Sequence, residues 1–419
     1  MKSHNRNRAS IETRALRLIA DPLFLFNAGQ KIGEMGIVGE ERNRLILLLA
    51  GIARNLPEPP SVLVKGSTSS GKSTLVKRSI QLFPPECVIE RAGLSQKALA
   101  YGGGSLASKI LFINEYRCGK DSQLLLRLLQ SEGRIKHEST MVQGARRGTK
   151  TLERLGTPVV LTTTTDEHVF SDDETRFLSL WVDESESQTL AILTAQASIS
   201  KAGNVQDLPV WRKAMSLLVS DKHDFSKPPA WLRYVAERLP LRNVRVRRDW
   251  NRFLSFCKAV AVCRRPLLRP DQALDITFED YCVAYRILEP VLASTVGGIS
   301  TQELSLSRAV SLLNKRCMRA VTVHEIAREL EWKPSLVYKH LKSAVTHGTV
   351  EYVPGARERN LKLVIANANA ARGFLPTPLS VFKNNPELRS LAKYVDPFTG
   401  KSQRIVRRKS EKRMAGGRR

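Results

Sequence analysis

The sequence predicts an α/β domain built around a phosphate-binding loop, with helical regions on both sides and a small helical unit with a two-stranded wing near the C-terminus. Two observations predict this organisation. A glycine-rich turn joins an apolar strand to a helix within residues 60–82, and residues 304–366 contain two short helices followed by two strands. We expect five parts: a helical N-terminal region (1–57), the α/β core (58–200), a helical lid (201–300), a helix-turn-helix with a wing (301–366) and a basic, disordered tail (367–419).

The central motif is Gly66-x-x-x-x-Gly71-Lys72-Ser73, which stands between the apolar run Ser61–Val64 and a segment with helical spacing. The glycines allow torsions that turn successive N–H groups toward phosphate oxygens; Lys72 supplies a positive charge, and the Ser73 hydroxyl can ligate Mg²⁺. A serine-rich surface turn before a helix is the alternative. The residues expected to bind ATP here are Gly66, Ser67, Thr68, Ser69, Ser70, Gly71, Lys72, Ser73 and Thr74.

Charge and composition restrict the class of partner. The 419 residues are 42% apolar, enough for two to four domains with real cores, so the chain is not a disordered protein. Lys and Arg number 67 against 40 Asp and Glu, a net charge of +27 that favours a polyanion such as DNA. A merely soluble cationic protein is the alternative.

Cysteine spacing and hydropathy indicate the compartment. Six scattered cysteines form no C-x-x-C pair, so neither a zinc site nor a disulfide framework is expected. The longest apolar run, Leu45–Ala53, is too short to span a bilayer, and the N-terminus leads into no signal-peptide core. We therefore expect a soluble, cytoplasmic protein.

Residues 1–57 have helical spacing, with an interruption near Pro22 and a second helix from Glu40 to Asn55. After the phosphate loop, the run Lys109–Glu115 (KILFINE) is typical of a strand. In P-loop ATPases the strand beside the phosphate loop ends in acidic residues, one holding Mg²⁺ through water and the next polarising the attacking water. Glu115 is the candidate base. Asn114 stands where a carboxylate is usual and can bind a metal-bound water, which leaves the rate of hydrolysis open; a core strand with a polar end is the alternative.

A hairpin follows. Residues 133–139 alternate like a strand, 143–150 form a basic turn, and 151–155 can return as the second arm. Arg146, Arg147 and Lys150 at its tip are suited to binding the phosphates of a nucleic-acid backbone. A solvated charged turn is the competing interpretation.

The last two features of the core are a strand that ends in hydroxyls and an arginine before a further strand. Residues 158–164 (PVVLTTT) place Thr164 or Thr165 where either could reach the γ-phosphate or the attacking water. Arg176, projected from a neighbouring subunit, would neutralise charge that develops on the γ-phosphate. An ordinary surface ion pair with Asp172 or Asp173 is the alternative for Arg176.

Together, the runs GSTSSGKST, KILFINE, LLQSEGRI, VVLTTTTDE and ETRFLSLWVDESESQT resemble the helicase-like ATPase module of bacterial and phage primase-helicase proteins. Their spacing is also similar to the minichromosome-maintenance branch of AAA+ helicases, where a hairpin precedes the sensor strand and an arginine lies just before the last strand. The likeness covers roughly residues 15–300. It departs in Asn114, and no zinc-binding or primase segment precedes the ATPase, so we do not expect primer synthesis.

This resemblance implies a P-loop NTPase fold of AAA+ type and a set of roles. Lys72 and Ser73 would bind nucleotide and Mg²⁺, Glu115 would activate water, Thr165 would be the sensor and Arg176 the finger that acts in trans. The hairpin would face a central pore. In the lid, Arg247 and Arg248 stand where the related helicases place a second nucleotide-sensing arginine; Arg248 is the first choice, and a basic helix start on the surface is the alternative.

The unit at residues 301–366 resembles a winged helix, with Ala327, Leu330, Val337, Leu341 and Val345 as expected core positions. Its DNA-facing residues would be Ser335, Tyr338, Lys339 and Lys342 toward the major groove and Arg357 and Arg359 along the backbone from the wing. Protein docking is the alternative role of such a unit. The tail from Lys401 onward is expected to be a disordered electrostatic tether or an appendage.

The function implied is that of an ATP- and Mg²⁺-dependent DNA helicase or translocase of a replication or mobile-element system. It would act as a hexameric ring, with single-stranded DNA in the pore and duplex DNA at the winged helix. Two alternatives stay open: a DNA-remodelling or transposition accessory ATPase without unwinding, and a nucleotide-switched DNA-binding regulator.

Overall fold

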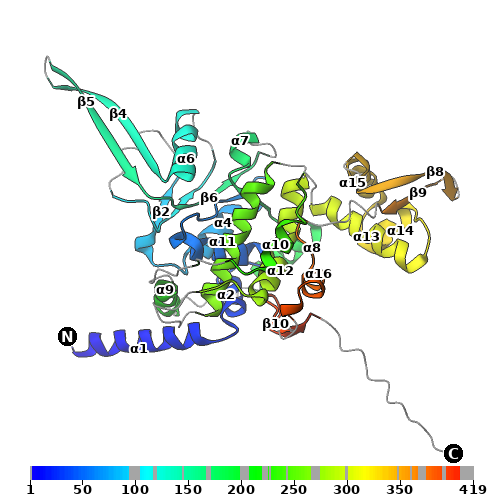
Figure 1. Ribbon diagram of the computed structural model, residues 1–419, viewed down its shortest axis with the longest axis horizontal. Helices are drawn as coiled ribbons and strands as arrows, with labels where there is room; N and C mark the ends of the chain where they lie inside the picture. The colour runs from blue at the N-terminus through cyan, green and yellow to red at the C-terminus, as the bar shows by residue number, and fades with distance from the viewer. Residues whose placement is uncertain are drawn as a thin grey trace, which may run out of the picture.

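A computed structural model describes most of the chain, and Figure 1 shows an α/β body with helices around it. The hairpin β4–β5 projects from one side of the body, and a separate unit of α13–α15 with β8 and β9 lies on the other side in this view. The described residues are 2–93, 104–116, 120–143, 146–166, 171–198, 207–218, 225, 228–241, 244–265, 274–297, 301–346, 349–358, 361–366, 374–388 and 393–405.

The body contains a five-stranded parallel sheet in the order β2-β3-β6-β1-β7. The strands are β1 (Val62–Lys65), β2 (Val88–Arg91), β3 (Ile110–Ile113), β6 (Val159–Thr164) and β7 (Leu178–Trp181). Strands that are buried on both faces read as continuous apolar runs, which is why β1, β3 and β6 stand out in the sequence. The predicted P-loop α/β fold is confirmed.

One prediction about the sheet is wrong. The strand that ends at Asn114 and Glu115 was expected beside the phosphate-loop strand, but β6 lies between β3 and β1. All six residues of β6 are buried, and its β-branched valines and threonines suit this central position. The hydroxyl-rich end of β6 is therefore the direct neighbour of the phosphate loop.

Side chains alternate between two cores across the sheet. Val62 and Val64 of β1 belong to the larger cluster, whereas Leu63 belongs to a smaller one. The smaller cluster is covered by α6 (Lys120–Glu132) through residues such as Leu126 and Leu129. The larger cluster takes in α1 (Lys2–Ala20), α2 (Phe24–Glu34), α3 (Glu41–Ile52), η1 (Ala53–Asn55) and α4 (Lys72–Ile80), together with the lid helices.

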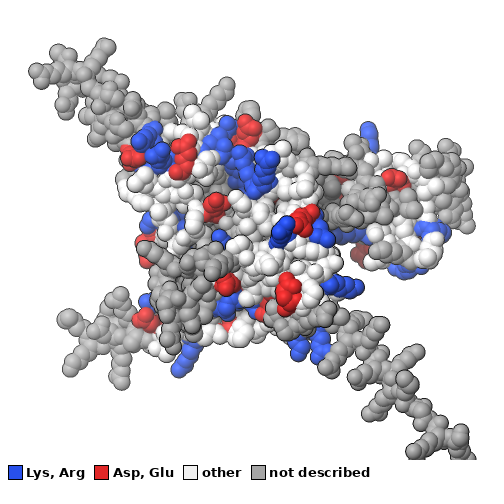
Figure 2. Space-filling model, in the orientation of Figure 1, with Lys and Arg blue, Asp and Glu red and all other residues white. Residues whose placement is uncertain are grey.

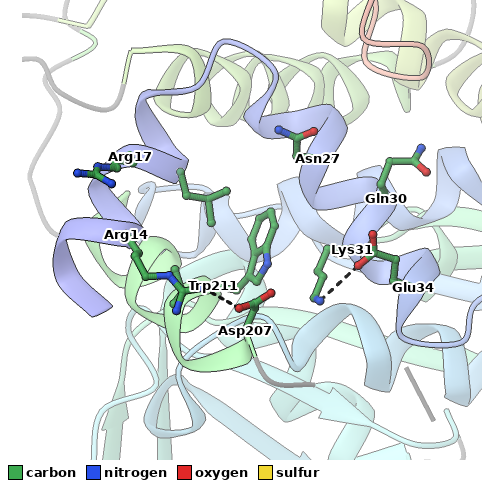
Figure 3. A pocket seen from close by; sticks show the side chains of 10 residues that line it. Arg14, Arg17, Asn27, Gln30, Lys31, Glu34, Asp207 and Trp211 are labelled. Carbon is green, nitrogen blue, oxygen red and sulfur yellow. Dashed lines mark hydrogen bonds and ion pairs between the residues drawn. The ribbon is translucent and has the colours of Figure 1, made fainter. Parts of the chain in front are cut away.

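The N-terminal region is helical as predicted, with the interruption at Asp21-Pro22-Leu23 between α1 and α2. A pocket of about 540 Å³ lies between these helices and α9 (Leu208–Leu217) and is lined by Arg17, Asn27 and Trp211 (Figure 3). At its side, Arg14 forms an ion pair of 2.8 Å with Asp207. This contact helps to join α1 to the lid.

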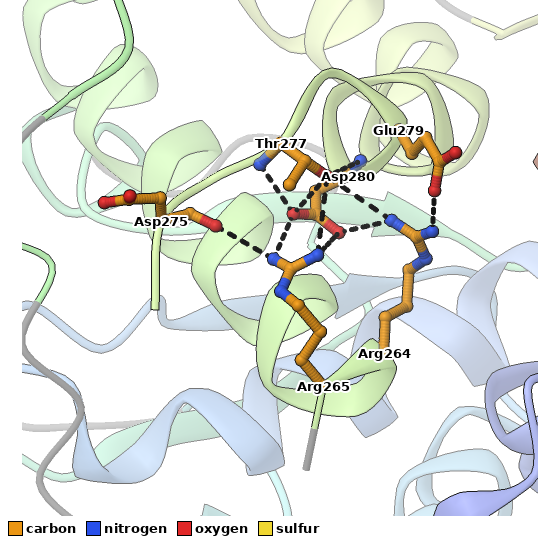
Figure 4. Close-up of polar contacts among 6 residues, drawn as sticks. All are labelled: Arg264, Arg265, Asp275, Thr277, Glu279 and Asp280. Atoms are coloured by element: carbon orange, nitrogen blue, oxygen red, sulfur yellow. Dashed lines mark hydrogen bonds and ion pairs between the residues drawn. The ribbon is translucent and has the colours of Figure 1, made fainter. Parts of the chain in front are cut away.

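After β7 come α8 (Glu186–Ala197), α9, α10 (Trp231–Ala236), α11 (Val246–Arg264) and α12 (Phe278–Gly297), of which α9 to α12 lie within the predicted lid, residues 201–300. A buried ionic cluster joins the end of α11 to the start of α12 (Figure 4). The fully buried Asp280 carboxylate accepts hydrogen bonds from Arg264 at 2.8 Å, from Arg265 at 2.5 Å and from the Thr277 N–H at 2.8 Å. Because a buried charge without partners is costly, this cluster holds the two helices in one arrangement.

The hairpin consists of β4 (Arg134–Gln143) and β5 (Arg146–Leu155), which pair from Arg134↔Leu155 to Gln143↔Arg146. The predicted pairing is confirmed, but the predicted basic turn over 143–150 is wrong. Lys150 lies in the ladder opposite Ser139, since antiparallel strands need only a two-residue connection. The connection, residues 144–145, lies outside the described part of the chain.

The C-terminal unit contains α13 (Thr301–Cys317), α14 (Val323–Leu330), α15 (Pro334–Thr346), β8 (Val350–Glu358) and β9 (Leu361–Ala366). Thr322 and Glu325 form a capping box that starts α14, and Glu331 ends it in the left-handed conformation. The unit has its own core. Of the expected positions, Ala327, Val337 and Leu341 are buried there, and Leu330 and Val345 pack partly buried against it.

The predicted disordered tail is wrong for residues 374–388 and 393–405. This segment contains α16 (Pro378–Asn384), η3 (Pro386–Leu388), β10 (Lys393–Val395) and β11 (Ser402–Arg404). Phe374, Leu375, Val381 and Leu388 are buried in the main core, so their apolar surface outweighs the basic composition of the region. Residues 406–419 lie outside the described part. No helix in the described residues is long and apolar enough to cross a membrane.

Candidate active site

The phosphate loop connects the end of β1 to the start of α4. Gly71 has a φ of +85°, a left-handed conformation that favours glycine, and it directly precedes Lys72 at the start of the helix. At Gly66 the loop passes so close to the end of β7 that a Cβ would lie 2.5 Å from Val182 Cγ2. Both glycines of the motif are therefore needed for the shape of the loop.

The Lys72 side chain is turned onto its own loop. It is 7% exposed, and its ammonium donates hydrogen bonds to the Gly66 carbonyl at 2.9 Å and to the Ser67 carbonyl. Burial lowers the pKa of Lys72, and the nearby carboxylates of Glu184 and Glu115 partly oppose this shift. The ammonium thus contacts the loop carbonyls and is under the electrostatic influence of two acidic residues.

An anion already contacts the loop. The Glu184 carboxylate, just beyond β7, accepts a hydrogen bond of 2.5 Å from the Ser67 backbone N–H. Backbone N–H groups of such loops bind phosphate oxygens in the same manner. The amide of Ser67, the ammonium of Lys72 and the start of α4 therefore fit a polyphosphate, and the Ser73 hydroxyl in the first turn of α4 suits a Mg²⁺ ion bound with it.

Residues beyond β3 and β6 meet at the same edge of the sheet, because these strands are parallel to β1. Glu115 follows β3 and is half-buried, and its charge acts on Lys72. Asn114 donates a hydrogen bond of 3.2 Å to Glu90, which also pairs with Lys77 at 2.8 Å. The structure therefore brings Lys72 and Glu115 together.

At the end of β6, Thr164 is buried and its hydroxyl accepts a hydrogen bond from the Asp166 N–H at 3.1 Å. Thr165 directly follows β6, which lies next to β1 in the sheet, and its side chain is exposed. Thr163 donates its hydroxyl proton to the Asn114 carbonyl, so the ends of β6 and β3 are linked. Thr165 is thus at the phosphate-loop edge with its side chain open to solvent.

Arg176 lies at the opposite edge of the sheet. It stands two residues before Leu178, which pairs with Val62 at the start of β1, whereas the phosphate loop follows Lys65 at the other end. At about 3.3 Å per residue, the strand alone separates the two edges by roughly 10 Å. The structure does not bring Arg176 to the phosphate loop of its own chain.

Arg176 belongs to a cationic pocket of about 540 Å³, which also includes Arg248 and Arg252. Its guanidinium donates from Nη1 to the Ser131 hydroxyl, while the buried Nε has no hydrogen-bond partner among the described residues. Burial, then the charges of Arg248 and Arg127, lower the pKa of Arg176. Figure 2 shows Lys and Arg side chains gathered near α7 (Ser171–Glu174) on this face.

Three contacts at the start of helix α11 hold this pocket. Arg248 donates to the Thr175 hydroxyl at 2.6 Å, directly beside Arg176. Asp249, fully buried, pairs with Arg245 at 2.9 Å and with Arg252. Arg248 is therefore a neighbour of Arg176 and not of its own phosphate loop. Sequence reasoning missed this grouping because residues 176 and 248 are far apart in the chain.

Sequence reasoning also missed Glu184. The only sequence signal for this residue is its place just after the last strand of the parallel sheet, within the run VDESES. Sequence alone does not distinguish Glu184 from Asp183 or Glu186 in that run. Glu40 was also missed: its carboxylate accepts from the Asp183 N–H at 2.7 Å and, mainly through burial, has a raised pKa. Together these residues shape the turn beside the loop.

The expected DNA-binding residues that the structure describes are distributed over three elements. On α15, the side chains of Ser335, Tyr338, Lys339 and Lys342 are exposed. Arg357 lies in β8 opposite Lys362, not in a loop, and Arg359 lies outside the described residues. Arg146, Arg147 and Lys150 lie on β5, and their side chains are outside the described part.

The fold and this loop define a P-loop NTPase domain. Residues 34–220 match the family model described as the MTBMA_p00010 P-loop domain, which spans the phosphate loop, the sheet and the hairpin. No curated protein sequence matches the chain closely enough to count as a relative.

Three solved structures are similar over much of the chain at low identity. The ORC1 protein of Aeropyrum pernix in complex with DNA is 13% identical, covers 85% of this chain and 95% of that chain, and has a TM-score of 0.24. NtrX from Brucella abortus in complex with ADP is 13% identical, with coverages of 75% and 71% and a TM-score of 0.25. The active helicase Cch of SCCmec type IV is 11% identical, with coverages of 78% and 68% and a TM-score of 0.31. Similarities at this level do not define a function.

Proposed function

We propose that this chain is an ATP-dependent DNA translocase or helicase of AAA+ type that acts as a ring, in a replication or mobile-element system. One observation carries the proposal. Arg176 lies in a cationic pocket at the sheet edge opposite its own phosphate loop, so it can complete a nucleotide site only in a neighbouring copy. The hairpin before β6 and the arginine before β7, the last strand of the sheet, support the AAA+ assignment.

The residues that would bind ATP and Mg²⁺ lie at the other edge. Loop N–H groups and Lys72 would hold the phosphates, and Ser73 would ligate the metal. The bound metal would neutralise charge on the phosphate oxygens. Glu115 would accept the proton of the attacking water, and Thr165 would orient that water.

Arg176 of one copy would face the γ-phosphate held by the next. This contact is heterologous, because the two edges of the sheet are different surfaces, and a heterologous contact that closes on itself produces a ring. We propose a hexamer. Arg248, which lies beside Arg176, would act on the same neighbouring site as the second nucleotide-sensing arginine.

For DNA, we propose two contacts. The unit of α13–α15, β8 and β9 would be a winged helix that binds duplex DNA, with Tyr338, Lys339 and Lys342 of α15 in the major groove. The hairpin β4–β5, which projects from the body in Figure 1, would carry Arg146, Arg147 and Lys150 toward a single strand in the pore. The net charge of +27 supports a polyanionic partner.

The test is an ATPase assay with and without single-stranded DNA, together with displacement of an annealed strand. We expect hydrolysis that DNA stimulates, and displacement that requires ATP. Hydrolysis without displacement would favour an accessory ATPase over a helicase. Absence of any hydrolysis in the assembled protein would contradict the motor.

A second candidate is a nucleotide-switched DNA-binding regulator, which one observation favours. Asn114, not a carboxylate, ends β3, and its amide is hydrogen-bonded to Glu90. A site with one acidic residue fewer would hydrolyse ATP slowly. In that case ATP would change the affinity for DNA while turnover stays at background.

A further inference from the structure

The position of Glu184 has a consequence for nucleotide binding. Its carboxylate accepts from the Ser67 N–H at 2.5 Å, and its Oε1 lies 2.8 Å from the point where a Cβ on Gly66 would be. Two carboxylates, Glu184 and Glu115, oppose the lowering of the Lys72 pKa by burial, and Glu184 has the larger effect. A negatively charged group of the protein therefore occupies the loop amide that would bind phosphate, and its charge acts on the Lys72 ammonium.

We propose that Glu184 is an internal competitor for the phosphate site, which a nucleoside polyphosphate must displace in order to bind. This proposal rests on nucleotide binding at the phosphate loop. A carboxylate oxygen and a phosphate oxygen accept the same Ser67 N–H, and two anions in one place repel each other. The polyphosphate has more charge and more acceptor oxygens than one carboxylate, so it displaces Glu184. Its affinity is lower than it would be for a loop without this carboxylate.

The turn that carries Glu184 is fixed, so displacement requires only rotation of the side chain. Val182 donates its N–H to the Lys65 carbonyl at 3.1 Å, and Asp183 donates to Glu40 at 2.7 Å. After Glu184, the Ser185 hydroxyl caps α8 by accepting from the Gln188 N–H at 3.2 Å. The backbone is thus held on both sides of Glu184.

The Gln188 side chain holds the same turn from the other side. Its amide donates to the Val38 carbonyl at 2.7 Å. The Glu184 side chain itself is exposed, so it can leave the loop for water without disturbing a core. The competitor is therefore an exposed side chain, hydrogen-bonded to the loop, on a backbone that is held on both sides.

The experiment measures the affinity of the full chain for ATP, without DNA, in the wild type and in Glu184→Gln, which keeps the shape and removes the charge. We expect the affinity to rise about fivefold, which corresponds to about 1 kcal/mol, as for an exposed charge interaction. Glu184→Ala should bind at least as tightly as Glu184→Gln. Glu186→Gln is the matched control, because it makes the same charge change two residues away at a side chain that is 97% exposed.

Inorganic pyrophosphate, used to displace a fluorescent ATP analogue, provides the second measurement. Its affinity should rise by the same factor as that of ATP, since the effect belongs to the phosphates. Equal affinities in the wild type and Glu184→Gln, or an equal gain in Glu186→Gln, would overturn the inference while the proposed ATPase stands. No binding by any of these proteins would overturn nucleotide binding and the inference with it.

Discussion

The two edges of the central sheet differ in how their cations are placed. At the phosphate-loop edge, Lys72 donates to its own loop carbonyls and has two carboxylates, Glu184 and Glu115, close enough to act on its pKa. At the opposite edge, Arg176 and Arg248 lie together in an open pocket, and the Nε of Arg176 is buried without a partner among the described residues.

This difference shows which edge of the sheet has positively charged side chains that are available to a second copy. A triphosphate with its metal needs more positive charge in the transition state than one lysine supplies. The phosphate-loop edge has acidic residues around that lysine, and the arginine edge has a surplus of guanidinium groups at least a strand length away. A second copy that places one edge against the other would balance both, and three predictions test this comparison.

The largest effect is expected from removing the cation at either edge. Lys72→Ala and Arg176→Ala should each lower the rate of ATP hydrolysis about 10³-fold or more, because one removes the phosphate-binding charge and the other the trans cation. An equal mixture of the two variants should regain activity. A site with the loop of the Arg176→Ala chain and the arginine of the Lys72→Ala chain is intact, and random assembly makes about a quarter of the sites intact.

The control is a mixture of either variant with the double variant, in which no intact site can form. Recovery in the first mixture alone would establish that Arg176 acts across a subunit boundary, and would also show that both variants fold. A first mixture that assembles but is as inactive as its components would contradict the comparison, since Arg176 would then serve only its contact with Ser131.

The phosphate edge could be predicted largely from local sequence. The phosphate-loop motif fixes a strand, a turn and a helix within one short segment, so Lys72 and Ser73 needed no tertiary information. The parallel direction of β3 and β6 then brings Glu115 and Thr165 to the same edge. Only the order of the strands was wrong, because side-chain pattern does not reveal which of two buried strands is the direct neighbour.

The arginine edge could not be predicted in this way. Arg176 and Arg248 meet because α11 packs beside the start of β7, and contacts between distant segments leave no periodic signal. The folded tail was missed for a related reason. Its basic composition favoured disorder, and nothing local in the sequence shows that the main core buries Phe374, Leu375 and Val381.

A smaller effect is expected at Arg248, which sharpens the comparison within the arginine edge. Arg248→Ala should lower the rate of hydrolysis about tenfold, or 1.4 kcal/mol, because a second guanidinium beside Arg176 adds to the same field. Arg247→Ala is the matched control: its side chain is exposed on the next residue of the same helix and does not line the pocket. Equal losses in both variants would mean that helix α11 itself had been disturbed.

The smallest effect concerns the stability of the helices that support the arginine edge. Arg245 and Arg248 belong to the start of α11, which packs on α12, and α12 carries the buried Glu289. Burial raises the pKa of Glu289 to about 8, although its carboxylate accepts from the Leu375 N–H at 2.8 Å and lies near Arg308.

Because the folded protein keeps a proton on Glu289 that the unfolded chain loses near pH 4.5, this group contributes stability below that pH and the contribution is lost as pH rises toward about 8. Glu289→Gln should remove this loss, so its melting temperature should fall less than that of the wild type between pH 5 and pH 8.5. Glu387→Gln, an exposed carboxylate on the same C-terminal segment, should follow the wild type. A parallel pH profile for Glu289→Gln and the wild type would contradict this role of Glu289 in the pH dependence of stability.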